Sequence, residues 1–170
     1  MIILIIGLTG GLLAIFYSAP PCLACRGLGD IVIAVCFGVL PVVGTVFIQN
    51  GVIVNESVWL GCVIGCFVSA ILWVNSIPDI EADKKAGKKT LPVRLGKKIS
   101  AYGLVVWFVM GFTILLESPL PVSSYIGLLA VIPAIKAVKS LLRGDLMPAI
   151  PMTLVTHTAV CLLLAVGCAI

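Results

Sequence analysis

The chain has 170 residues, of which 61% are hydrophobic and 11% are charged, and its mean hydropathy is +1.26. A soluble domain carries about 25% charged and about 45–50% apolar residues. This composition excludes an ordinary soluble enzyme, a disordered tail and a nucleic-acid-binding module. It indicates an all-α integral membrane protein.

Six apolar runs follow one another along the chain, and none shows the strict alternation of a membrane-barrel strand. They cover residues 1–17, 29–49, 57–77, 99–116, 122–139 and 148–169. Each comes near the about 20 residues that cross a bilayer as a helix. We therefore expect one transmembrane domain over residues 1–170 with six helices. Gly61 and Gly65 have a spacing that lets two membrane helices approach closely.

The basic residues lie on or next to only one of the two sets of loops that alternate between these runs. This set comprises residues 18–28, 78–98 and 140–147, which contain nine of the eleven Lys and Arg, and the other two, Lys136 and Lys139, lie just before residue 140. The opposite loops have none, and their charged residues are Glu56 and Glu117. The positive-inside rule then predicts a multi-pass protein of the cell membrane whose loop 78–98 is cytoplasmic.

Several smaller features are interpreted as structural. The seven cysteines, an odd number in apolar surroundings, are expected to be small buried side chains without a disulfide framework. Cys22 and Cys25 form a C-x-x-C that lacks the second ligand pair of a structural zinc site. The tryptophans are interpreted as packing or interface residues, and His157 as an intramembrane histidine. A group of bases near the fifth run is interpreted as setting topology, with anionic lipid headgroups as possible ligands; it comprises Lys136, Lys139 and Arg143.

Acidic residues after the third run have a regular spacing. Asn75, Asp79 and Asp83 stand at i, i+4 and i+8, so a continuous helix would place them on one face. Two carboxylates beside an amide suit Mg²⁺, which takes one or two carboxylates together with phosphate oxygens and water. The spacing predicts a metal site in which Asp79 and Asp83 are the ligands.

The same segment is strongly basic. Residues 78–98 contain seven bases and three acids, which gives 7 − 3 = +4. Lysines that follow Asp83 would meet phosphate charge, and Gly87 permits a turn that brings them back over the site. A solvated loop that fixes topology through its lysines would explain the bases but not the spacing of the acids.

Two stretches resemble a known family. Residues 79–96 read D-x-x-x-D-x-x-x-G-x-x-T-L-P-V-R-L-G and resemble the second aspartate-rich motif of the UbiA superfamily of membrane prenyltransferases. Residues 17–30 read Y-S-A-P-P-C-L-A-C-R-G-L-G-D and look like the segment that links the family's fourth and fifth helices. The resemblance is greatest to the branch that prenylates 1,4-dihydroxy-2-naphthoate in menaquinone synthesis.

The resemblance implies a fold with nine transmembrane helices and two cytoplasmic aspartate-rich motifs that hold Mg²⁺ against a polyprenyl diphosphate. The six runs here look like the fourth to ninth helices. The first motif, N-D-x-x-D, is absent, because Asp30 and Asp145 have no acidic partners nearby. We therefore expect that the chain lacks the first three helices and is inactive alone. A natural half-protein that assembles with a separate N-terminal half is the alternative.

The implied reaction is the Mg²⁺-dependent transfer of a polyprenyl group to an aromatic acceptor, expected to be 1,4-dihydroxy-2-naphthoate. The residues expected to be catalytic are Asp79, Asp83, Tyr17 and Arg26. The residues expected to bind the diphosphate are Asn75, Lys84, Lys88 and Arg94. Tyr17 matches the tyrosine of a family Y-x-x-x-K pattern. Pro21 occupies the lysine position, and Arg26 is expected to replace that cation.

Two alternatives remain open at this point. A prenyltransferase of the same fold could use another acceptor, such as 4-hydroxybenzoate, a haem or chlorin, or a glyceryl lipid phosphate. A six-helix transporter or scaffold is a different class. A transporter is expected to carry ionisable residues at mid-membrane, whereas the helix interiors here offer only His157.

Overall fold

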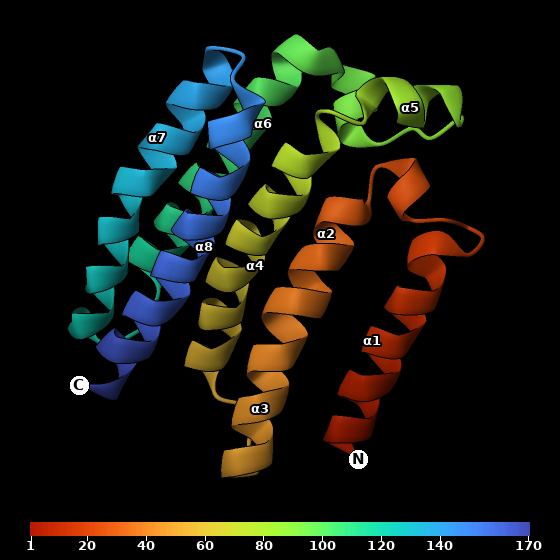
Figure 1. The fold of residues 1–170 in the computed structure, drawn as a ribbon. Coiled ribbons are helices and arrows are strands. Elements are labelled where there is room, and N and C mark those ends of the chain that lie inside the picture. Colours follow the sequence, from red (N-terminus) through yellow and green to blue (C-terminus); the bar gives the residue numbers. More distant parts are fainter.

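Six helical rods run back and forth between two ends of the molecule in the computed structural model, which describes all residues 1–170 (Figure 1). In chain order the rods are α1 (Ile2–Ser18), α2 with η2 and α3 (Gly29–Asn50), α4 (Asn55–Ser76), α6 (Leu91–Glu117), η3 with α7 (Val122–Leu142) and α8 (Leu146–Ala169). Two short helices, η1 (Ala24–Arg26) and α5 (Ile80–Lys85), lie between rods. Five rods are long and apolar enough to cross a membrane, and α1 is a shorter apolar helix. The predicted all-α membrane architecture is confirmed.

Helix α4 lies at the centre of the packing. It contacts α6, α8 and the rod formed by α2, η2 and α3. Its fully buried side chains include Val63, Phe67, Ala70 and Val74. By contrast, α1 has no buried residue. The core therefore forms between the later helices, with α1 at one side of the bundle (Figure 1).

The second rod crosses α4 at unusually short range. A Cβ atom added to Gly38 would lie 2.4 Å from the Gly65 Cα, and one added to Gly65 would lie 2.7 Å from the Ala34 carbonyl oxygen. The close approach expected from the glycine spacing in α4 is confirmed. Gly38 lies in the π-helical segment η2 (Val35–Val39), which ends two residues before Pro41. Proline lacks an N–H group and crowds the carbonyl four residues earlier, which accounts for the widened turn.

Side-chain hydrogen bonds also join the helices. The Ser69 hydroxyl donates to the Asp30 carbonyl oxygen at 2.7 Å, and the Trp73 indole donates to the Ser100 carbonyl oxygen at 2.7 Å. Trp73 is buried, and Gly103 lies beside its ring, where any Cβ would overlap it. Trp73 is therefore a packing residue, as expected. Such polar links hold helices together where lipid provides no hydrophobic drive.

The region 78–98 is more structured than the single loop expected. It contains α5 and the beginning of α6, whose helical course is broken at Gly96 with φ 75° and ψ 163°. This backbone conformation is essentially restricted to glycine. Figure 1 shows α5 at the end of the bundle opposite both chain termini, together with the α1–α2 and α7–α8 connections. The three basic connections therefore share one end, as the charge pattern predicts.

Gly38→Ala is expected to destabilise the protein by about 1–3 kcal/mol, because a methyl group must be forced into a packed crossing. Gly7→Ala is the matched control, since its added Cβ would meet nothing within 4 Å. In a helix this control is expected to be neutral or stabilising by up to about 1 kcal/mol. Thermal unfolding in detergent micelles measures both changes. Equal midpoints for the two variants would contradict the close crossing.

Candidate functional site

A cavity of about 350 Å³ opens at the basic end of the bundle, between α1, α2, α4 and the segment that contains α5. Its polar lining includes Tyr17, Asp30, Asp83, Lys88 and Thr90. Two of the predicted catalytic residues and one predicted diphosphate ligand thus meet in one place. The full lining comes from three separate stretches of the chain, within 17–30, 72–76 and 83–92, so the cavity exists only in the folded bundle.

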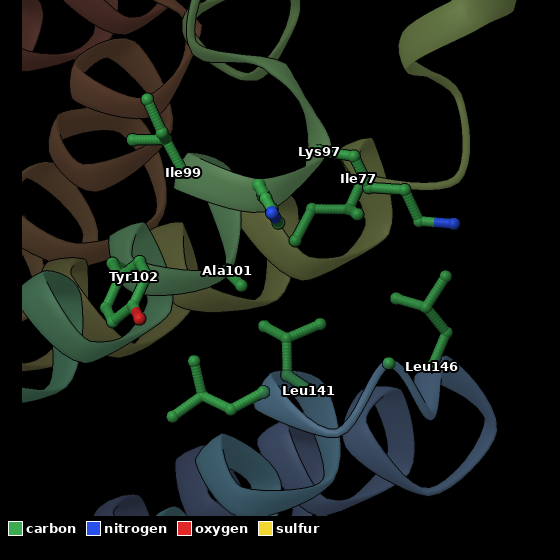
Figure 2. A pocket seen from close by; sticks show the side chains of 10 residues that line it. Ile77, Lys97, Ile99, Ala101, Tyr102, Leu141 and Leu146 are labelled. Carbon is green, nitrogen blue, oxygen red and sulfur yellow. The ribbon is translucent and has the colours of Figure 1, made fainter.

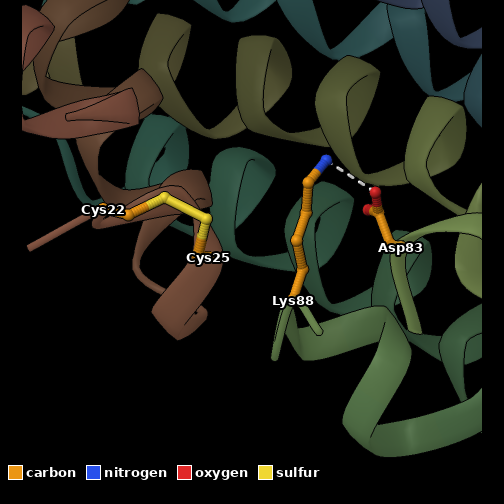
Figure 3. The surroundings of a disulfide bond; sticks show 4 residues. All are labelled: Cys22, Cys25, Asp83 and Lys88. Atoms are coloured by element: carbon orange, nitrogen blue, oxygen red, sulfur yellow. Dashed lines mark hydrogen bonds and ion pairs between the residues drawn. A yellow bond between two sulfur atoms is a disulfide. The ribbon is translucent and has the colours of Figure 1, made fainter. Parts of the chain in front are cut away.

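An ion pair stands on one wall of this cavity. The Lys88 Nζ atom lies 2.6 Å from the Asp83 Oδ1 atom, as Figure 3 shows. The hydrogen bond and the negative charge of Asp83, with a smaller contribution from Asp79, raise the pKa of the Lys88 amine. Lys88 therefore carries a positive charge beside the carboxylate at neutral pH.

A helix C-cap explains how Lys88 returns to Asp83. The Lys88 N–H donates to the Asp83 carbonyl oxygen and the Gly87 N–H donates to the Lys84 carbonyl oxygen. This is the Schellman pattern, which ends a helix with a left-handed residue. Gly87 occupies that position with φ 74°. The turn expected at Gly87 is confirmed.

Two loops that are distant in sequence hold each other at the cavity. The Lys89 N–H donates to the Cys25 carbonyl oxygen at 2.7 Å. The Arg94 guanidinium donates to the carbonyl oxygens of Arg26, at 2.7 Å, and of Lys89, at 2.8 Å. The two loops can approach each other because Gly27 has no side chain. A Cβ atom added to Gly27 would lie 3.2 Å from the Lys89 carbonyl oxygen. Arg94 thus links the loops, and its contact with a diphosphate stays a prediction.

The shared helical face expected for the acidic spacing is wrong. Helix α4 ends at Ser76 and α5 begins at Ile80, because Pro78 lacks the N–H group that would continue the helix. Asn75 therefore lies on α4, Asp79 caps α5, and Asp83 lies within α5. Of these three, only Asp83 lines the cavity. Six of the eight predicted site residues are exposed: Arg26, Asn75, Asp79, Lys84, Lys88 and Arg94.

Asp30 is a site residue that the sequence reasoning missed. Its side chain lines the cavity although only 5% of the residue is exposed. The one ion pair in the structure joins Lys88 to Asp83, so Asp30 has no basic partner. A buried carboxylate without a counter-ion is costly and usually serves a function. No acidic residue stands near Asp30 in the sequence, so no motif marks it as a site residue. The charged residues that share its cavity, Asp83 and Lys88, come from a distant part of the chain.

The expectation that the cysteines form no disulfide is wrong for one pair. Cys22 and Cys25 are bonded, with their Cα atoms 5.2 Å apart, a separation that disulfides commonly span. The tight turn ahead of η1 brings the two residues together. Figure 3 shows the bond near Lys88 and Asp83, and both sulfur-bearing residues line the cavity. The other five cysteines are free.

The carboxylates of the site fit one kind of metal binding. Residues 1–170 contain no group of three or more His, Cys, Asp or Glu side chains that could hold a metal ion. Mg²⁺, however, commonly uses only one or two carboxylates and takes its other ligands from water and substrate phosphates. Asp83, which is 17% exposed, and Asp79 one helical turn earlier provide such oxygens. The donor set suits an ion that is shared with a diphosphate.

Comparison with known proteins identifies the class. Residues 1–149 match the family described as "UbiA prenyltransferase family", and the chain belongs to this family. It is a multi-pass membrane protein of this family. No solved structure matches the chain significantly.

Three individual relatives show how similar the chain is to particular proteins. The chain is 28% identical to the 1,4-dihydroxy-2-naphthoate octaprenyltransferase of Bacillus subtilis over 96% of its length and 55% of the relative's. It is 47% identical to the protein of the same name from Haemophilus influenzae, over 41% of the chain and 23% of that relative. A UbiA prenyltransferase domain-containing protein of Dictyostelium discoideum is 32% identical over 73% of the chain and 38% of that relative. The chain thus spans about half the length of the Bacillus subtilis relative.

Gly87→Ala is expected to weaken the binding of inorganic diphosphate with Mg²⁺ several-fold, because a left-handed alanine costs about 1–2 kcal/mol and shifts Lys88 away from Asp83. Gly144→Ala is the matched control, since Gly144 has φ 88°, its added Cβ would meet nothing within 4 Å, and it lies outside this cavity. Isothermal titration calorimetry measures binding, and thermal unfolding measures stability. Both variants should lose similar stability; unchanged binding in Gly87→Ala would contradict the role of the turn.

Proposed function

We propose that this chain provides the second aspartate-rich site of an enzyme that transfers a polyprenyl group from polyprenyl diphosphate to an aromatic acceptor. The observation that carries the proposal is the cavity where Asp83, Lys88, Asp30 and Tyr17 meet at the basic end of the bundle. It combines anionic oxygens for a metal with a cation for phosphate, at the border of an apolar region suited to a prenyl chain. This end is proposed to face the cytoplasm, because all Lys and Arg gather there.

The diphosphate is proposed to bind between the carboxylates and the bases. Asp79 and Asp83 would hold Mg²⁺, which supplies positive charge to the leaving diphosphate when bound. Lys88 stands next to Asp83 and donates to a phosphate oxygen from the same wall, while Lys84 adds charge from the neighbouring position on α5. Asn75 and Arg26 complete the rim in this proposal. Arg94 holds the two loops together through its hydrogen bonds to backbone carbonyl groups.

The chemistry requires charge separation in a dry site. The bond between the prenyl C1 carbon and the diphosphate oxygen breaks, and the oxygen keeps the electron pair. An electron-rich aromatic carbon then forms a bond to C1 and loses its substituent, which is a carboxylate released as CO₂ in the case of 1,4-dihydroxy-2-naphthoate. In this proposal the Tyr17 hydroxyl donates to the diphosphate. The buried Asp30, which lines the same cavity, accepts a proton from an acceptor hydroxyl group.

The proposed acceptor is 1,4-dihydroxy-2-naphthoate, which would place the enzyme in menaquinone synthesis. Support comes from the printed names of the Bacillus subtilis and Haemophilus influenzae relatives. It also comes from the stretch 17–30, which lines the cavity with Tyr17 and Asp30. Comparing this acceptor with 4-hydroxybenzoate in one assay tests the choice.

The proposed activity needs more protein than these residues supply. One pair of carboxylates holds only part of the Mg²⁺ that neutralises a diphosphate, and the chain spans 55% of the Bacillus subtilis relative. The purified chain with MgCl₂, polyprenyl diphosphate and 1,4-dihydroxy-2-naphthoate is expected to give no product by mass spectrometry. Co-expression with the part of that relative outside the match is expected to give turnover. Equal turnover by the chain alone would refute this requirement.

In the active assembly, Asp79→Asn and Asp83→Asn are each expected to lower kcat by about 100-fold or more, the loss typical of removing one charge-stabilising group. Glu81→Gln is the matched control, because Glu81 is an acidic residue of the same segment, on α5 between the two aspartates, and is not one of the proposed metal ligands. Its turnover should stay within about twofold of wild type, as for a surface group that contacts no substrate. Near-normal turnover in both aspartate variants would rule out the metal assignment.

A further inference from the structure

A second, larger cavity of about 520 Å³ lies where α4 ends, where α6 resumes after its break, and where α7 turns into α8. Its apolar lining includes Ile77, Ala101, Leu141 and Leu146. Figure 2 shows Leu141 and Leu146 on one side of this cavity and the α6 residues on the other. The residues of the diphosphate site are not among its lining residues, so this cavity is a separate site.

Two cations border this apolar space. Lys97 and Lys98 both line it, and both are exposed. Neither has an acidic partner, because the one ion pair in the structure joins Lys88 to Asp83. Arg143 adjoins the lining residues Leu142 and Gly144, and the acid next along the chain is Asp145. The rim therefore carries a net positive charge.

The backbone fixes the depth at which these lysines lie. The long continuous part of α6 begins after Gly96, so Lys97 and Lys98 stand in its first turn, at the membrane boundary. A helix N-terminus disfavours cations and favours anions. The two lysines at this position therefore do not stabilise the helix. Tyr102 lines the cavity one turn deeper, and tyrosine is typical of the headgroup level of a bilayer.

We propose that this cavity is a binding site for an anionic phospholipid of the leaflet at the basic end. One acyl chain would enter the apolar space between α6 and the α7–α8 turn, and the headgroup phosphate would lie against Lys97 and Lys98. Charge complementarity selects this occupant: an apolar groove alone accepts any lipid, whereas two unpaired lysines at its rim favour a negative headgroup. The inference does not depend on the proposed prenyl transfer.

Native mass spectrometry of the full chain in detergent tests the site. The chain is titrated with phosphatidylglycerol and, separately, with phosphatidylcholine that has the same acyl chains. Each lysine near a membrane surface contributes about fivefold to the binding of an anionic lipid, so the preference for phosphatidylglycerol is expected to reach about 25-fold. Equal binding of the two lipids would overturn the proposal.

A matched pair of double variants separates the site from general surface charge. Lys97→Gln with Lys98→Gln should abolish the preference. Lys85→Gln with Lys89→Gln removes the same charge from the segment before Gly96, outside the cavity, and should keep it. All four lysines are exposed, so these changes do not disturb the core. Equal loss in both variants would assign the preference to diffuse charge and overturn the proposal.

Two further measurements distinguish the other occupants. Ala101→Phe fills the apolar part of the cavity and should remove lipid binding while the charge is retained; a thermal midpoint near wild type shows that it folds. Inorganic phosphate added in excess should not displace the lipid, and complete displacement would indicate a phosphate site instead. A dimer that Ala101→Phe converts to monomer would assign the cavity to a second copy of the chain.

Discussion

Hydrogen bonds between two loops that are more than sixty residues apart hold the candidate active site together. The loop after α1 offers the carbonyl oxygens of Cys25 and Arg26, and the segment after α5 supplies the Lys89 N–H and the Arg94 guanidinium as donors. This contact brings the segment that carries Lys88 against the loop between Tyr17 and Asp30. The bundle below provides rigidity, because α4 packs against α6, α8 and the rod formed by α2, η2 and α3, and Gly38 meets Gly65 at close backbone range.

Polar groups have different hydrogen-bond partners within the membrane-spanning rods and at the basic end of the bundle. Within the rods, backbone groups bond internally and the remaining polar side chains link one helix to another, as Ser69 and Trp73 do. At the basic end, backbone that is not helical bonds to side chains and to other loops. Charged groups can be arranged at low desolvation cost at this end, outside the apolar rods, and both cavities described above open there.

The sequence allowed the helices to be predicted well, because a bilayer requires about 20 apolar residues for each crossing and the runs are separated by polar stretches. The basic end, the turn at Gly87 and the crossing at Gly65 were also predictable from local patterns. Prediction failed where the outcome depends on contacts between distant residues. Asp30 has no polar neighbour in sequence that would mark it, and the break at Pro78 displaced Asn75 from the face assumed for Asp83. The bond between Cys22 and Cys25 depends on a turn that composition does not encode.

The non-helical backbone at Gly96 has an effect that extends beyond the shape of α6. In the sequence, the bases from Lys84 to Lys98 form one continuous cluster, but the break divides them into two groups. Lys88 lines the smaller cavity beside Asp83, whereas Lys97 and Lys98 line the larger one beside the α7–α8 turn. One surface loop thus serves two separate pockets, and charge can be gained or lost at one of them without altering the lining of the other.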